Sequence, residues 1–158
     1  MRRFAFRLEN VLRVRKKLEE AAQRNFSRAL GELLEAKAKL EKAVERLQVF
    51  IREHRLESGV FTAAEIVMID NYIALVNKKI QELRAVKDEK EREMNRLLHL
   101  LKEAKKARKL LDNLKGRKLE RYMEELNREE TVELDDVTQK IGLNREMLTV
   151  EDPVVEDM

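Results

Sequence analysis

The fold is decided by residues 22–50, which read AQRNFSRALGELLEAKAKLEKAVERLQVF. Alanine recurs every seven residues in this stretch, and a second row of large apolar residues recurs with the same period between the alanines. The two rows are Ala22, Ala29, Ala36 and Ala43, and Phe26, Leu33, Leu40 and Leu47. Apolar residues at alternating steps of four and three form one stripe along an α-helix. The stretch therefore predicts a helix that packs along its length against a second helix.

The same pattern extends in both directions and is interrupted once. The first stripe runs from Ala5 to His54, with 12 of its 15 positions apolar, and a second stripe runs from Ile69 to Ala104. Between them, Ser58-Gly59 is a helix stop in which glycine can take the left-handed cap conformation. Thr62 and Glu65 then have the spacing of a capping box, flanked by Phe61 and Ile66 as a hydrophobic staple. Stop and start signals this close together predict an αα-hairpin.

The predicted fold is all-α, a long antiparallel two-helix coiled coil with a flexible acidic C-terminal tail. Residues 1–57 hold the first helix, which begins near residue 4, and residues 58–61 form the turn. Residues 62–128 hold the second helix, and residues 129–158 form the tail, with one short helix near residues 134–141. The antiparallel pairing ends the first helix opposite residue 115 of the second, so residues 116–128 are expected to overhang without an intramolecular partner.

The composition excludes several classes of function. The 158 residues include one Pro, four Gly and no Cys, which excludes sheet-rich folds, disulfide frameworks and cysteine zinc sites. His54 and His99 lie at different heights of the predicted hairpin and cannot share a metal ion. No glycine-rich nucleotide motif is present, and a two-helix hairpin offers no pocket that desolvates a catalytic group. We therefore expect no enzyme activity, no cofactor, no metal and no small-molecule substrate.

Charge is distributed unevenly along the chain. Residues 129–158 carry ten acidic and two basic side chains, whereas residues 1–18 and 102–118 each carry a net charge of +6. The antiparallel pairing places the two basic segments at one end. From the residues alone, that end fits an acidic protein partner, an anionic membrane, nucleic acid, or a solvated surface neutralised by the acidic tail. Nucleic acid is disfavoured because no aromatic residues lie among these charges and no known reading module is present.

Motifs at the two ends of the helical region sharpen this choice. The chain begins with FRLENVLRVR at residues 6–15, followed by KKLEEA, and later has Glu129-Glu130 and Leu134-Asp135-Asp136. Over residues 1–140 these motifs, the length and the hairpin resemble the FliJ family of flagellar export proteins. The resemblance implies a cytoplasmic component of the flagellar type III export apparatus, peripheral at the cytoplasmic face of the cell membrane. It also implies a coiled-coil stalk that promotes the assembly and activity of a hexameric export ATPase, couples it to the membrane export-gate protein, and escorts export chaperones.

The resemblance also implies two sets of contact residues. The ATPase-ring contact is expected at Phe4, Leu8, Arg13, Arg15, Lys16, Arg108, Lys109, Arg117 and Tyr122. The export-gate contact is expected at Tyr72, Val76, Lys79 and Leu83, of which Val76 and Leu83 also lie on the predicted seam. Two alternatives remain open: the equivalent stalk of a virulence-type secretion system, and a basic coiled-coil adaptor for anionic membrane or nucleic acid.

Overall fold

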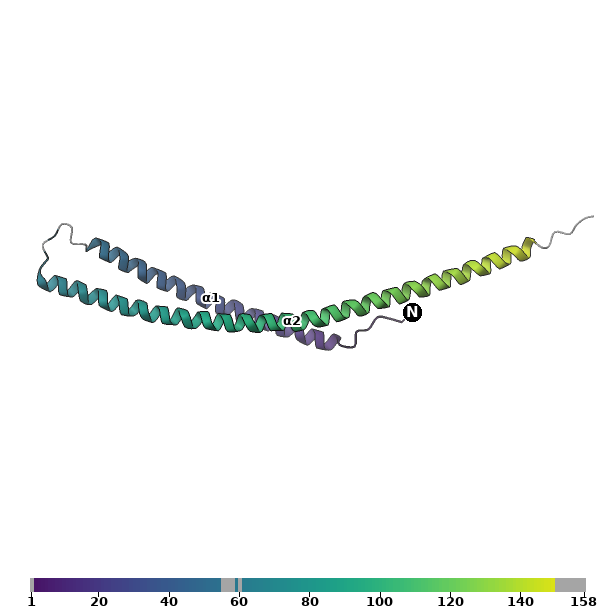
Figure 1. The fold of residues 1–158 in the computed structure, drawn as a ribbon, viewed down its shortest axis with the longest axis horizontal. Coiled ribbons are helices and arrows are strands. Elements are labelled where there is room, and N and C mark those ends of the chain that lie inside the picture. Colours follow the sequence, from purple (N-terminus) through teal and green to yellow (C-terminus); the bar gives the residue numbers. More distant parts are fainter. Residues whose placement is uncertain (1, 55–58, 60, 150–158) are drawn as a thin grey trace, which may run out of the picture. The chain divides into compact units, whose positions relative to one another are not determined.

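The computed structural model describes residues 2–54, 59 and 61–149. It contains two helices, α1 at Glu9–Glu53 and α2 at Ala63–Thr149, and no strand among the residues described (Figure 1). The chain divides into two units. The hairpin unit is Asn10–Lys109, and the terminal unit combines Met1–Glu9 with Leu110–Met158.

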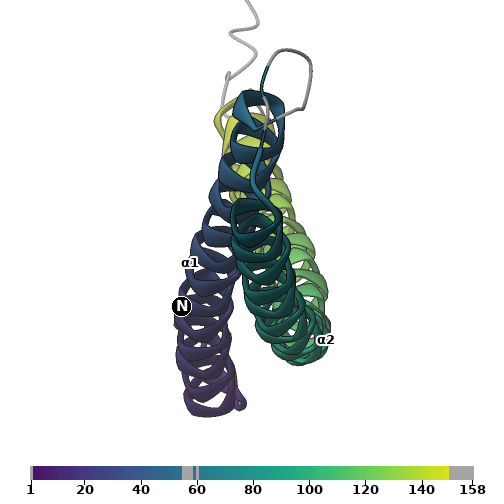
Figure 2. The ribbon, with the colours of Figure 1, turned by 90° about the vertical axis from the view of Figure 1, so that its left-hand side faces the viewer.

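In the hairpin unit, α1 and the first part of α2 run antiparallel. Phe50 contacts Tyr72, with ring centroids 4.4 Å apart, and the Lys90 ammonium donates to Glu32 over 2.9 Å. Arg108 donates to Glu19. Residue numbers rise along one helix as they fall along the other, and Figures 1 and 2 both show the two helices side by side. The antiparallel two-helix coiled coil predicted from the sequence is confirmed.

The core of the hairpin unit is the predicted seam. Its buried side chains are Leu12, Ala29, Leu33, Ala36, Ile80 and Leu101, and every one of them belongs to a predicted row. Leu12 and Leu33 are 1% and 2% exposed. Burial of a leucine side chain stabilises a fold by about 1.5–3 kcal/mol, so a few large side chains, with alanines that let the helix backbones approach closely, hold the hairpin together.

The connection between the helices agrees with the prediction at the start of α2 and differs from it at the end of α1. The capping box is confirmed: the Thr62 amide donates to Glu65 over 3.0 Å, and the Glu65 amide donates to the Thr62 hydroxyl over 3.3 Å. The left-handed cap predicted at Gly59 is wrong, because no described glycine has a positive φ, and Ser58 lies outside the described residues. Instead α1 ends at Glu53, and His54 Nδ1 donates to the Phe50 carbonyl over 2.9 Å. The Phe50 carbonyl thus accepts from the backbone amide of His54, over 3.0 Å, and from its imidazole.

Helix α1 also begins later than predicted, at Glu9 instead of near residue 4. Cations in a first helical turn oppose the helix macrodipole, whereas an acid there is favourable. Arg2, Arg3 and Arg7 precede the helix and Glu9 opens it. Phe4, Phe6 and Leu8 are buried or half-buried at every second position, while the residues between them are exposed. This period of two is that of an extended segment, not of a helix.

Helix α2 continues through most of the expected tail, to Thr149, so the predicted end near residue 128 and the flexible tail from residue 129 are wrong over residues 129–149. Glu, Leu, Lys, Arg and Met are strong helix formers and outweigh the cost of about 1 kcal/mol each for Gly116 and Gly142 inside the helix. Pro153 and the rest of residues 150–158 lie outside the described part of the chain.

Candidate functional site

The terminal unit contains an N-terminal arm, Arg2–Leu8, that lies against α2. Residues 2–6 have no regular secondary structure, and residues 7 and 8 form a turn in which the Glu9 amide donates to the Phe6 carbonyl over 3.1 Å. Phe4 packs on Tyr122 with ring centroids 5.5 Å apart, and the Tyr122 hydroxyl donates to the Arg2 carbonyl. Phe6 is 8% exposed, and the Lys118 ammonium lies 5.8 Å from the centre of its ring. A cation over an aromatic face adds electrostatic attraction to the apolar contact. The arm is therefore held by two aromatic contacts and one hydrogen bond.

The start of α1 lies opposite residue 115 of α2, as predicted, but Glu9 stands there and not residue 4, so the predicted pairing is shifted along α1. Lys115 Nζ is 2.8 Å from a carboxylate oxygen of Glu9, the first residue of the helix. The first helix thus runs out opposite residue 115, as expected. The expectation that residues 116–128 have no intramolecular partner is wrong, because the chain continues beyond the helix as the arm and contacts Lys118 and Tyr122.

The arm and the α2 segment beneath it form a basic surface, which we call the arm cluster and define as residues 2–9 and 110–122. It carries seven basic and three acidic side chains, a net charge of +4. Its exposed cations are Arg2, Arg3, Arg7, Arg117, Lys118 and Arg121. Beside it lies a hollow of about 520 Å³, lined by Arg2, Tyr122, Glu125, Leu126 and Glu129. The surface thus presents cations around an aromatic pair, with carboxylates at one border.

The residues predicted to contact an ATPase ring are divided between the two units. Phe4, Leu8, Arg117 and Tyr122 belong to the terminal unit, and Arg13, Arg15, Lys16, Arg108 and Lys109 belong to the hairpin unit. The structure brings Phe4 and Tyr122 into direct contact. Arg108 is half-buried and pairs with Glu19, so it also supports the hairpin. Phe6 and Lys118 are missing from the predicted set, although the alternation of Phe4, Phe6 and Leu8 was a usable signal for the arm.

The residues predicted to contact an export gate lie near the start of α2. Tyr72 is 46% exposed, and its ring contacts Phe50, which in turn stacks on His54 at 4.1 Å. Val76 and Leu83 are half-buried, as their seam positions require, and Lys79 is exposed. Two strongly exposed apolar side chains beside Tyr72, Met68 and Leu75, are absent from the predicted set. With Tyr72 they follow the spacing i, i+4, i+7 of one helix face.

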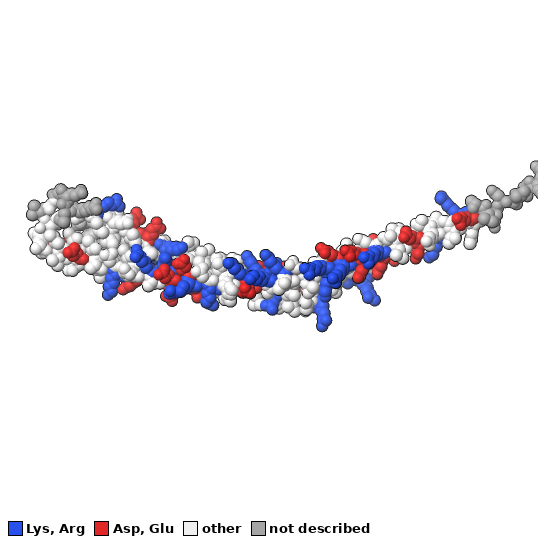
Figure 3. Space-filling model, viewed as in Figure 1, with Lys and Arg blue, Asp and Glu red and all other residues white. Residues whose placement is uncertain are grey.

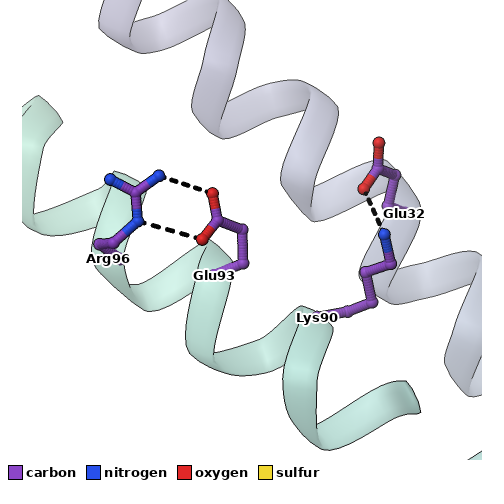
Figure 4. Close-up of polar contacts among 4 residues, drawn as sticks. All are labelled: Glu32, Lys90, Glu93 and Arg96. Atoms are coloured by element: carbon purple, nitrogen blue, oxygen red, sulfur yellow. Dashed lines mark hydrogen bonds and ion pairs between the residues drawn. The ribbon is translucent and has the colours of Figure 1, made fainter.

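Charged residues along the hairpin form ion pairs between the two helices and within one helix (Figure 4). The Glu32 carboxylate bonds to Lys90 and raises the pKa of that ammonium. On α2, Arg96 donates to both carboxylate oxygens of Glu93, over 3.0 and 2.7 Å, and lowers the pKa of Glu93. Acidic and basic atoms are intermingled over much of the face shown in Figure 3. Exposed pairs of this kind contribute little to stability, and they favour one helix register over others.

Two further kinds of feature do not occur among the described residues. No group of His, Asp or Glu side chains there is arranged to hold a metal ion. No helix within residues 9–53 or 63–149 has an apolar run long enough to cross a membrane.

The comparisons with known proteins give one match. The sequence profile of the family described as flagellar FliJ protein matches residues 4–146. No curated protein and no solved structure matches the chain. The profile covers most of the arm, all of α1 and α2 as far as residue 146, including the two regions that carry the predicted contacts. The chain therefore belongs to the flagellar FliJ family, a family of flagellar export apparatus components and not of enzymes.

Proposed function

We propose that the protein is a stalk that promotes the assembly and activity of the hexameric flagellar export ATPase and couples it to the membrane export gate. The observation that carries the proposal is the arm cluster. It presents six exposed cations around the contact between Phe4 and Tyr122. An ATPase hexamer with an acidic lining would be attracted by these charges. Its side chains could then pack against the aromatic rings of Phe4 and Tyr122.

The hairpin unit suits the coupling role. Its two helices pack along a continuous seam, so a load applied at one point is carried by packed side chains instead of by loops. Tyr72 lies near the start of α2, and Val76, Lys79 and Leu83 follow on the next turns. In the proposal these residues contact the export gate, which holds the protein at the cytoplasmic face of the membrane, and the same helices also receive export chaperones.

The gate contact is tested with the soluble domain of the cognate export-gate protein. Lys79→Glu reverses an exposed charge without touching the seam, and we expect it to weaken binding by about threefold to tenfold. Tyr72→Ala should weaken binding more, whereas Tyr72→Phe keeps the ring contact with Phe50 and reports on the hydroxyl alone. If all three variants bind like the parent chain, the gate contact does not lie here.

The ring contact is tested by adding the full chain to the cognate export ATPase while following hydrolysis rate and oligomer size together. The test variant carries Arg3→Glu, Arg7→Glu and Arg117→Glu, all exposed in the arm cluster. Its matched control carries the same charge change at Lys37, Lys42 and Arg24, which are exposed on α1. We expect the parent chain and the control to drive hexamer formation and raise turnover, and the test variant to lose at least about tenfold in apparent affinity.

Other outcomes contradict the proposal in distinct ways. Equal losses in test and control variants would mean that net charge, not the arm cluster, attracts the ATPase. An ATPase that ignores the parent chain at every ratio would exclude the stalk mechanism. Binding of duplex DNA or anionic vesicles in its place, with a steep dependence on salt, would favour the basic adaptor. Stimulation of a virulence-type ATPase but not of the flagellar one would favour the virulence stalk.

A further inference from the structure

The last part of α2 is not covered by any other described helix. Every side chain from residue 127 to residue 148 is exposed. A single helix surrounded by water normally lacks the packing that stabilises helices in proteins. The feature is therefore either wholly solvated or completed by another chain.

One face of this segment is apolar, which favours the second possibility. Its apolar side chains recur at steps of three and four. The large apolar side chains between residues 132 and 148 have exposed fractions of 52% to 75%. We call this face the distal stripe: Met123, Leu134, Val137, Ile141 and Leu148, with Asn127, Glu130 and Asn144 at its three polar positions. Val132 and Leu143 lie about half a turn away, on the opposite face. Five of these eight positions are apolar, and their alternating steps of four and three are those of a coiled-coil seam.

We propose that the distal stripe pairs with the distal stripe of a second copy of this chain, antiparallel about a twofold axis. The charges beside the stripe select this occupant. Glu133 and Lys140 flank it on the same side, seven residues apart. Glu133 and Lys140 occupy the same heptad position in successive heptads. In an antiparallel pair, residues at this flanking heptad position face each other across the interface. Glu133 therefore faces Lys140 of the second copy, and the twofold axis produces a second, identical ion pair.

The register follows from the same pairing. When facing residues have numbers that sum to 271, Leu134 packs on Val137 of the second copy, and Met123 packs on Leu148. The polar positions also match, since Asn127 faces Asn144 and the two amides can bond to each other. On the other side of the stripe, Glu124 lies close to Arg145 of the second copy. Glu130 faces Ile141 in the layer next to Leu134 and Val137, and its side chain must extend out of the seam to keep the carboxylate in water.

Neighbouring arrangements are disfavoured by like charges. A shift of one heptad in one direction places Lys140 beside Lys140, and a shift in the other places Glu133 beside Glu133. A parallel pair places Glu130 on Glu130 inside the seam and Lys140 near Arg145. Like charges across such interfaces are destabilising, so one antiparallel register is selected.

The test is sedimentation equilibrium of the full chain at low salt, where ion pairs are least screened, over about 1 to about 200 µM. We expect a monomer–dimer equilibrium. Leu134→Gln with Val137→Gln should weaken the dimer by at least about a hundredfold, because four apolar side chains per dimer are lost from the seam. The matched control, Val132→Gln with Leu143→Gln, removes equally exposed apolar side chains from the opposite face and should change the constant by less than about twofold. Circular dichroism verifies that every variant remains helical.

A charge exchange tests the orientation. Lys140→Glu alone and Glu133→Lys alone should each weaken the dimer by about threefold to tenfold, and the double exchange should restore it. A dimer strengthened by Lys140→Glu would be parallel and would overturn the register. A chain that stays monomeric at the highest concentration, or a dimer lost through the control face, would overturn the proposal. Neither result bears on the ATPase assay, which uses the arm cluster.

Discussion

Replacement of Leu33 by alanine should destabilise the hairpin far more than the same replacement at the next residue, Leu34. Leu33 is 2% exposed in the seam, whereas Leu34 is 57% exposed on the outer face of the same helix. Loss of a buried leucine costs about 2–5 kcal/mol. The lower half of this range applies, because the seam is one layer deep and water can fill the space left. We expect about 2–3 kcal/mol at Leu33 and less than about 0.5 kcal/mol at Leu34.

Thermal and urea unfolding followed by circular dichroism at a helical wavelength measure both values. A loss of 1 kcal/mol lowers Tm by about 2–4 °C in a chain of this size, so Leu33→Ala should lower it by about 5–10 °C and Leu34→Ala by no more than about 2 °C. The change in helix propensity is the same in both variants, which makes Leu34→Ala a direct control. Equal effects, or a larger effect at Leu34, would refute the seam register on which the other arguments depend.

Three further results are expected. Thr62→Ala should cost about 1 kcal/mol by removing the capping hydroxyl, and Thr62→Ser should retain most of it, measured by the same unfolding experiments. Phe6→Ala should release the arm, seen as faster amide hydrogen exchange over residues 2–8 with unchanged helix content, whereas Arg7→Ala, an exposed neighbour, should not. Because Arg96 lowers the pKa of Glu93 below its ordinary value near 4.5, this pair contributes stability above that pH and loses it as the pH falls through the lower folded value. Glu93→Gln should therefore flatten the acid limb of the Tm–pH curve slightly, and an unchanged limb would contradict the assignment.

Most of the hairpin was predictable because its determinants are local or periodic. The alanine and leucine rows indicated which residues are buried, since burial on a helix follows the heptad spacing directly. The capping box involves residues three apart, so Thr62 and Glu65 are sufficient to identify it. The seam also explained why Val76 and Leu83 are half-buried, whatever further role they have.

The parts that were missed depend on competition between local tendencies or on distant contacts. Residues 129–149 are acidic, and acidity was interpreted as disorder, although the same residues are strong helix formers in continuous register with α2. The arm was assigned to the helix because Leu8 fits the heptad rows. Its alternating pattern favours a non-helical segment instead. The contact of Phe4 with Tyr122, more than 110 residues away in sequence, stabilises that alternative.

The arm changes what a binding partner can recognise. If residues 2–8 continued α1 as a helix, their cations would lie around a cylinder and Phe4 would be available to a partner. In the structure Phe4 and Phe6 are already engaged with Tyr122 and Lys118 of α2. A partner therefore meets a composite surface, in which side chains of the arm and of α2 are held together by the aromatic contacts. Cations held on a packed base lose less conformational entropy on binding than cations on a free segment. This is the physical reason to seek the ATPase contact in the arm cluster as a folded unit, and not in the N-terminal sequence alone.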